Sequence, residues 1–219
     1  MDITGNPFND ARPSYYLKSI GGYHAAKLRR YQDLIDSYLS QGDIAVMGML
    51  NTKYVVLQDD VPPVVNSHAY GNCWFVDGLI LADNADEELT LLGAVDLRST
   101  AIVRREDAVE VPESGWDIYD ADEIRLVSYA ANELHYAYRT SVPRVAVFSE
   151  VYYPGWVSDQ VELFRADWTL RAAVVPAGEG EIVMRFEPQS YKRGENISRA
   201  SSILLLLVLL ASLVAPVAA

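Results

Sequence analysis

Cysteine, histidine and positive charge are all scarce in this sequence of 219 residues. Cys73 is the single cysteine, so an internal disulfide is excluded, and its apolar surroundings favour a buried, inert thiol. The three histidines, His24, His68 and His135, lie far apart and lack the spacing of metal ligands. With 18 Lys and Arg against 30 Asp and Glu, the net charge of −12 argues against a nucleic-acid partner.

The glycine and serine motifs of common enzymes are also absent. The 13 glycines form neither a P-loop nor a dinucleotide-binding fingerprint, and there is no Gly-x-Ser-x-Gly elbow. We therefore predict no catalytic residue, no metal site and no cofactor in this chain. Paired carboxylates are what glycosidic chemistry requires, yet a chain with 30 acids places several near any turn by chance. A solvated face is the preferred interpretation of one such group, Glu150, Asp159, Glu162 and Asp167.

The clearest pattern that is present is a β-rich stretch over residues 145–188. Its last segment alternates Ile182, Met184 and Phe186 with more polar residues, which is typical of a strand with one buried and one wet face. Residues 168–175 show the same period of two. Strand signals at regular spacing from residue 123 onward predict a β-sandwich or jelly-roll-like domain over residues 111–196. Its predicted core contains Phe148, Trp168, Leu170, Ile182, Met184 and Phe186.

Residues 1–110 mix helical and strand patterns and are predicted to form a small α/β lobe. Turn-forming residues predict irregular structure over residues 1–20, and Gly42 is expected to end the first helix. Asn84 or Asp86 is expected to cap a later helix. The predicted elements are helices at 23–39, 45–50 and 86–93 and strands at 53–58, 73–76 and 101–104. An acidic segment, 104–122, is predicted to be a loop between the lobes, and the class is α+β, mainly β.

The C-terminus predicts one transmembrane helix, assigned to residues 197–219. Residues 200–219 carry no charge, and twenty helical residues span about 30 Å, the thickness of the hydrocarbon core. Residues 1–20 show no apolar segment typical of a signal peptide. The basic residues Lys192, Arg193 and Arg199 just before the helix favour a cytoplasmic position of the preceding domain, by the positive-inside tendency.

Three ordered motifs resemble the C-terminal extracytoplasmic region of YfhO-like bacterial membrane proteins. They are residues 21–33 (GGYHAAKLRRYQD), residues 49–54 (MLNTKY) and a spaced set that runs from the YYPGW of 152–156 to the RFEP of 185–188. The resemblance covers most of the chain. It implies an extracytoplasmic domain at the bacterial cytoplasmic (inner) membrane, preceded by upstream transmembrane helices of a parent protein. The family resembles glycosyltransferases that use lipid-linked sugars, with the catalytic acid expected among those upstream helices.

Six residues near the Tyr-Pro-Gly-Trp turn are candidate ligand contacts: Tyr153, Trp156, Arg165, Asp167, Trp168 and Arg171. Aromatic faces stack on sugar rings, and arginine offers a planar donor fork to phosphate. The same aromatics also suit a sandwich core or a membrane-interface anchor, and the arginines suit cross-strand ion pairs. The short return from Trp156 to Arg165 predicts a hairpin that brings both residues together with Tyr153.

Two functions remain open on these observations. The first is an extracytoplasmic accessory domain that positions a cell-envelope glycopolymer or a lipid-linked sugar for glycosyl transfer and is not catalytic alone. The second is a non-enzymatic, membrane-anchored envelope-binding or structural module. The expected partners are the lipid bilayer, the upstream helices and an envelope glycopolymer. The basic residues Lys18, Lys27, Arg29 and Arg30 face either anionic lipid headgroups or solvent.

Overall fold

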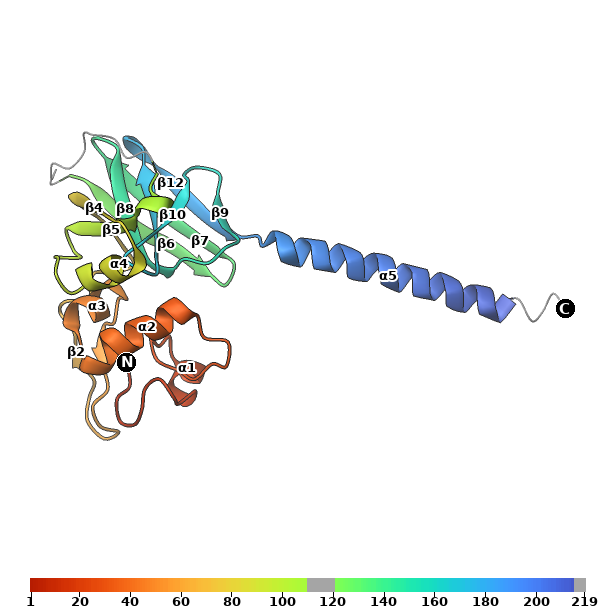
Figure 1. Cartoon of the computed structure of the whole chain (residues 1–219), viewed down its shortest axis with the longest axis horizontal. Coiled ribbons are helices and arrows are strands. Elements are labelled where there is room, and N and C mark those ends of the chain that lie inside the picture. Colours follow the sequence, from red (N-terminus) through yellow and green to blue (C-terminus); the bar gives the residue numbers. More distant parts are fainter. Residues whose placement is uncertain (110–120, 215–219) are drawn as a thin grey trace.

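The computed structural model describes residues 1–109 and 121–214, which form a β-rich globular region with a long C-terminal helix (Figure 1). Two four-stranded antiparallel sheets make up the larger part of the globular region, and a lobe of short helices and strands lies beside them. The predicted α+β, mainly β class is confirmed. Most of the predicted loop 104–122 lies outside the described residues.

The two sheets have the strand orders β10-β11-β8-β3 and β6-β7-β12-β9. Their strands are β3 (Cys73–Phe75), β6 (Glu123–Ala130), β7 (Glu133–Thr140), β8 (Arg144–Val151), β9 (Trp156–Ser158), β10 (Leu163–Ala166), β11 (Leu170–Val175) and β12 (Gly178–Phe186). Strand β3 comes from the predicted N-terminal lobe and pairs with β8, Cys73 opposite Phe148. The first sheet therefore takes one strand from the N-terminal half of the chain.

The two sheets pack face to face around a buried apolar cluster. Ile182 and Met184 on β12 point inward, and the Tyr136 and Phe148 rings meet edge to face with centroids 4.7 Å apart. The predicted alternation along β12 is confirmed, except that Phe186 at its end is only partly buried. This is the arrangement that period-two patterning produces when one face of each sheet meets the other.

The N-terminal lobe contains short helices and a parallel strand pair. Its elements are α1 (Arg12–Tyr16), α2 (Arg29–Ser37), the 3-10 turn η1 (Leu39–Gln41), α3 (Ile44–Met49), β1 (Tyr54–Val55), β2 (Val64–Val65), β4 (Gly78–Ala82), α4 (Ala85–Leu91), β5 (Thr100–Arg104) and the 3-10 turn η2 (Arg105–Asp107). Strands β4 and β5 are parallel, with α4 connecting them. Asn84 caps α4 by accepting a hydrogen bond from the Glu87 amide (2.9 Å), as predicted.

Two predictions for the first forty residues are wrong in detail. Helix α1 lies within the segment expected to be irregular, with Pro13 in its first turn, where a missing N–H costs nothing. Helix α2 is shorter than the predicted 23–39, because Leu28 is extended (φ −62°, ψ 134°) and Tyr38 leaves helical geometry. Gly42 has the left-handed conformation expected of a helix end (φ 73°), but it ends the 3-10 turn η1 and not the helix α2.

The lobe covers the outer face of the first sheet, so this sheet is buried on both sides. Leu170 and Ala172 on β11 join a core with Leu34 and Met49 of the lobe, whereas Ala173 belongs to the core between the sheets. A wet face was predicted for this strand, and that prediction is wrong. Leu34 and Met49 lie more than a hundred positions before Leu170 in the sequence, so the local pattern of β11 carries no sign of them.

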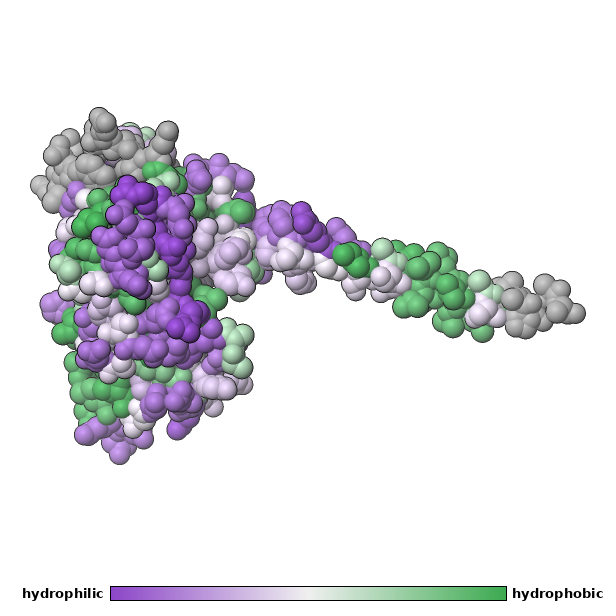
Figure 2. Space-filling view, viewed as in Figure 1, coloured by the Kyte–Doolittle hydropathy of each residue, from purple (hydrophilic) through white to green (hydrophobic). Residues whose placement is uncertain are grey.

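Helix α5 (Gln189–Val214) follows β12 after two residues and projects away from the globular region (Figure 1). None of its described side chains is buried, and it is long and apolar enough to cross a membrane. Figure 2 shows that its first part is hydrophilic and its second part hydrophobic. The helix begins earlier than the predicted 197, since residues 189–196 are helical as well, and residues 215–219 lie outside the described part.

Candidate functional site

The Tyr-Pro-Gly-Trp turn lies where α5 leaves the sandwich. The Gly155 carbonyl accepts a hydrogen bond from the Glu187 amide (2.6 Å), two residues before α5 begins. Gly155 has a φ of 112°, and a Cβ built there would lie 3.0 Å from the Cα of Pro188. Glycine is therefore required both by the backbone conformation and by the close approach of the segment that leads into α5.

An aromatic cluster covers this junction. Tyr153 and Trp156 both pack against Phe186, with ring centroids 6.2 and 5.4 Å apart. The Tyr153 side chain remains 47% exposed, while Trp156 is half-buried. Their apolar bodies are held by the fold while the Tyr153 ring stays accessible at the end of the domain, which is an arrangement suited to an interface.

A buried arginine lies behind Trp156. The Arg171 guanidinium is 4.1 Å from the centre of the Trp156 ring, and its Nη2 bonds Glu150 at 3.3 Å. Burial lowers the pKa of Arg171 and raises the pKa of Glu150, while the opposite charge of each partner counteracts both shifts. Arg171 is 2% exposed, so in this conformation its charge is compensated by Glu150 inside the sandwich.

The predicted hairpin between Trp156 and Arg165 does not form. Strand β9 pairs with β12 in one sheet, whereas β10 pairs with β11 in the other, so the chain crosses between sheets over residues 159–162. Arg165 forms an ion pair with Asp107 instead of joining Tyr153 and Trp156. Arg171, the cross-strand neighbour of Arg165, supplies the guanidinium beside Trp156.

Asp167 is fully buried in the turn between β10 and β11. Its Oδ1 accepts a hydrogen bond from the Ile102 amide on β5 (2.8 Å), and its Oδ2 has no partner among the described residues. Asp167 and Trp168 both have positive φ, 48° and 68°. Burial raises the pKa of Asp167 to about 7, and the nearby charge of Glu88 adds to that effect.

Glu88 on α4 forms the other half of this buried acidic pair. It accepts a hydrogen bond from the Trp168 amide (3.1 Å) and lies 3.5 Å from Arg30 of α2. Burial raises the pKa of Glu88, and the charges of Arg165 and Arg30 oppose that rise. The Trp168 indole donates to the Arg30 carbonyl (2.7 Å) while the Arg30 guanidinium stacks 4.5 Å from the ring. These contacts join the lobe to the first sheet.

The six candidate ligand contacts therefore divide into two groups. Tyr153, Trp156 and Arg171 lie at the root of α5, and Arg165, Asp167 and Trp168 lie at the contact between sheet and lobe. Asp167, Trp168 and Arg171 are at most 5% exposed, so they are closed to a ligand in this conformation. Tyr153 is the most accessible of the six, and ligand contact by it stays a prediction.

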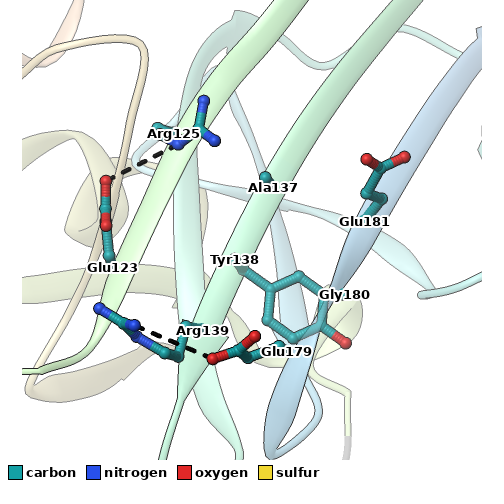
Figure 3. Close-up of a pocket in the computed structure, with 8 residues that line it drawn as sticks. All are labelled: Glu123, Arg125, Ala137, Tyr138, Arg139, Glu179, Gly180 and Glu181. Carbon is teal, nitrogen blue, oxygen red and sulfur yellow. Dashed lines mark ion pairs between the residues drawn. The ribbon is translucent and has the colours of Figure 1, made fainter.

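A shallow hollow of about 400 Å³ lies on the outer face of the second sheet (Figure 3). Ala137 leaves space between longer charged side chains on β6, β7 and β12, and two loose ion pairs border it, Arg125–Glu123 (3.8 Å) and Arg139–Glu179 (3.9 Å). Sequence reasoning missed this hollow. The sequence does place arginine and glutamate at outward positions of β6, β7 and β12. These residues could not be grouped into one hollow, because the register of the three strands does not follow from the sequence.

The described residues contain no group of three metal-ligating side chains. The predicted absence of cofactors stays a prediction. A scan against protein-family models, a search of the curated proteins and a search of the solved structures each found no match for this chain.

Proposed function

We propose that this chain is an extracytoplasmic accessory domain of a YfhO-like polytopic membrane protein, anchored by α5 in the bacterial cytoplasmic membrane. In this proposal it positions a lipid-linked sugar or a cell-envelope glycopolymer beside the bilayer, and glycosyl transfer is catalysed among upstream transmembrane helices. The resemblance of the motifs in residues 21–33, 49–54 and 152–188 supports the family, and the length and apolar composition of α5 support the anchor. A jelly-roll-like relation between the two four-stranded sheets belongs to the same proposal.

The observation that carries the proposal is the exposed Tyr153 ring at the root of α5. A sugar on a membrane lipid projects outward from the headgroup zone, and the polar first part of α5 holds this end of the sandwich just outside that zone. An aromatic face there offers a stacking surface for a sugar ring, and the bond between Glu187 and Gly155 fixes the turn that presents it.

The buried carboxylates support an accessory role. Glu88 and Asp167 have the raised pKa values typical of many catalytic acids, yet both side chains are fully buried. A general acid must come within hydrogen-bond reach of its substrate. Glu150 is already paired with Arg171. These acids therefore serve the fold in the proposed role.

Tyr153→Ala tests the proposal, with Tyr54→Ala as a matched control. Tyr54 on β1 is 57% exposed, compared with 47% for Tyr153, but it lies in the N-terminal lobe. The full chain is placed in nanodiscs that contain a polyprenyl-phosphate-linked hexose, and binding is measured by titration. Tyr153→Ala should weaken binding about tenfold, in line with one lost aromatic contact of 1–1.5 kcal/mol. Equal binding by both variants at unchanged melting temperature refutes the sugar-positioning role.

The hollow over Ala137 favours the second candidate, a non-enzymatic envelope-binding module. Arg125 and Arg139 are both exposed and their ion pairs are long, and Arg139 Nε also donates to the Ala121 carbonyl (3.2 Å), so their remaining N–H groups are available to the oxygens of a polysaccharide. Arg139→Ala should then reduce retention of the full chain on immobilised alginate, while Tyr153→Ala leaves it unchanged. If Arg139→Ala leaves the retention unchanged, the hollow over Ala137 is excluded as the polysaccharide-binding site.

A further inference from the structure

Residues 12–30 are a basic island in an acidic protein. They contain five of the 18 Lys and Arg residues and no Asp or Glu, whereas the whole chain has a net charge of −12. Two of the five are engaged in the lobe, because Arg30 binds Glu88 and Lys27 donates to the Phe8 carbonyl. Arg12 and Lys18 are exposed, and the Arg29 side chain is 90% exposed although it pairs with Asp33.

The same segment exposes large apolar and aromatic side chains. Tyr15, Tyr16, Leu17 and Tyr23 are 82%, 73%, 67% and 62% exposed. Tyrosines beside lysine and arginine are the composition found where proteins meet the headgroup layer, since the ring is amphipathic and the cations attract anionic lipid.

This segment lies at the end of the globular region from which α5 departs. The Lys18 Nζ lies 3.2 Å from the centre of the Tyr129 ring at the end of β6, and the next turn supplies the Asn132 carbonyl that accepts from the Phe186 amide (2.9 Å) just before α5. Figure 1 shows α1 and the loop after it on the side toward which α5 runs, and α5 runs outward with a slight downward slope in this view, in which the N-terminal lobe is the lower part of the globular region.

We propose that residues 12–29 make a second membrane contact, with the anionic headgroups of the bilayer that α5 spans. This inference rests on the anchoring role of α5 in the proposed function. The polar first part of α5, residues 189–199, is about 16 Å long, while one headgroup layer is about 5–8 Å thick. Contact therefore requires α5 to tilt toward the lobe. Membrane helices tilt by about 20° on average, and a tilt in that direction lowers the lobe toward the lipid.

Environment-sensitive labels on the full chain in nanodiscs test this contact. Leu17→Cys places a nitrobenzoxadiazole label on the segment, and Val65→Cys is its matched control, because both native residues are 67% exposed. Val65 lies on β2, on the side of the lobe away from α5 in Figure 1. Cys73 does not compete for the label, since it is buried and burial raises its pKa to about 12.

The label at position 17 should show blue-shifted emission and quenching by headgroup spin-labelled lipid in phosphatidylglycerol nanodiscs, and the label at 65 should show neither. Arg12→Gln with Lys18→Gln should lower the ratio of contacting to free molecules by about fivefold per residue. Equal quenching at both positions overturns the proposal. Quenching at position 17 that is the same in anionic and in neutral lipid, and is unchanged in the double variant, overturns it as well.

A chain that fails to enter the nanodisc overturns the anchor and this contact together. Quenching at 17 without any binding of the lipid-linked hexose leaves this contact standing and refutes only the sugar-positioning role.

Discussion

The two faces of the sheet β10-β11-β8-β3 are both buried, but only the contact with the lobe holds a carboxyl without an opposite charge beside it: Glu88 pairs there with Arg30, and Asp167 does not. On the face toward the second sheet, Arg171 is compensated by the opposite charge of Glu150 and by the Trp156 ring. At the contact with the lobe, Asp167 is held by a neutral backbone amide and leaves Oδ2 without a partner among the described residues. A neutral donor offsets less of the desolvation cost of a carboxylate than a nearby cation does. The pKa of Asp167 is therefore raised to about 7, well above the ordinary value of an aspartate.

The sheet β10-β11-β8-β3 contributes side chains to two hydrophobic cores, one on each of its faces. Val147 and Leu170 belong to the core with the lobe, while Phe148 and Ala173 belong to the core between the sheets. A change in either core therefore acts on the same strands, and we expect the lobe and the sandwich to unfold together.

The largest expected effect is that of Phe148→Ala. The side chain is fully buried and contacts Tyr136, so its removal should lower the free energy of unfolding by about 3–5 kcal/mol. Leu170→Ala on the opposite face should cost about 2–5 kcal/mol. Urea unfolding in detergent, followed by tryptophan fluorescence, measures both. Two separate transitions in the Leu170 variant would show that the lobe and the sandwich are independent units.

The second expected effect is a dependence of folding stability on pH that comes from Asp167, at the face toward the lobe. The Asp167 carboxyl has a pKa raised to about 7, so the folded state binds its proton more tightly than the unfolded state does. This contribution to stability is fully present below the unfolded pKa of about 4 and is lost as the pH rises through the folded value. Asp167→Asn keeps the acceptor for the Ile102 amide and removes the titration. It should raise stability at pH 8 relative to the parent chain by on the order of 2–4 kcal/mol.

Melting temperatures of the two proteins between pH 5 and pH 8 check this expectation. The parent chain should lose stability across that range more steeply than the Asn variant. Glu150→Gln serves as the control on the other face, and it should keep the slope that Asp167 causes. Parallel curves for the parent and the Asn variant would mean that Asp167 is ionised in the fold at little cost.

Much of this two-core arrangement could be predicted from the sequence, but only where contacts are local. The period of two along β12 predicts the inward residues Ile182 and Met184, and Asn84 is one of the two residues expected to cap α4. The burial of Asp167 could not be predicted, because its partner Ile102 lies 65 positions away. Strand β4 is not predicted from the sequence, since its residues show no alternation: Ala82 is its one buried residue, and its parallel partner β5 lies about twenty positions later.

The candidate site was predicted in part for the same reason. The Tyr-Pro-Gly-Trp motif correctly predicts a turn at one end of the domain, because Pro154 and Gly155 favour a turn through their own backbone preferences. The partner of Trp156 was misassigned to Arg165, because the crossing of the chain between two sheets depends on which strands pair. Sequence spacing alone cannot distinguish a short hairpin from such a crossing.

A smaller effect is expected from Glu150→Gln. The substitution keeps a hydrogen-bond acceptor for Arg171 but removes the charge that compensates the buried guanidinium, so it should cost about 1–3 kcal/mol. Glu150 is 23% exposed, and water at this rim limits the loss. Urea titration measures it. A change below about 0.5 kcal/mol, the size of an exposed ion pair, would show that the Trp156 ring alone suffices for Arg171.

The smallest effect on stability is expected from truncation after Arg199, which removes the apolar part of α5. No described side chain of α5 is buried, and both cores lie wholly within the globular region, so the melting temperature of that region should not change. Membrane association should be lost completely, because the remaining helix is polar and too short to cross a bilayer. Carbonate extraction should leave the full chain in the membrane fraction and release the truncated chain. A full chain that is released would refute the membrane span, and a lowered melting temperature after truncation would show that α5 packs on the sandwich in a membrane.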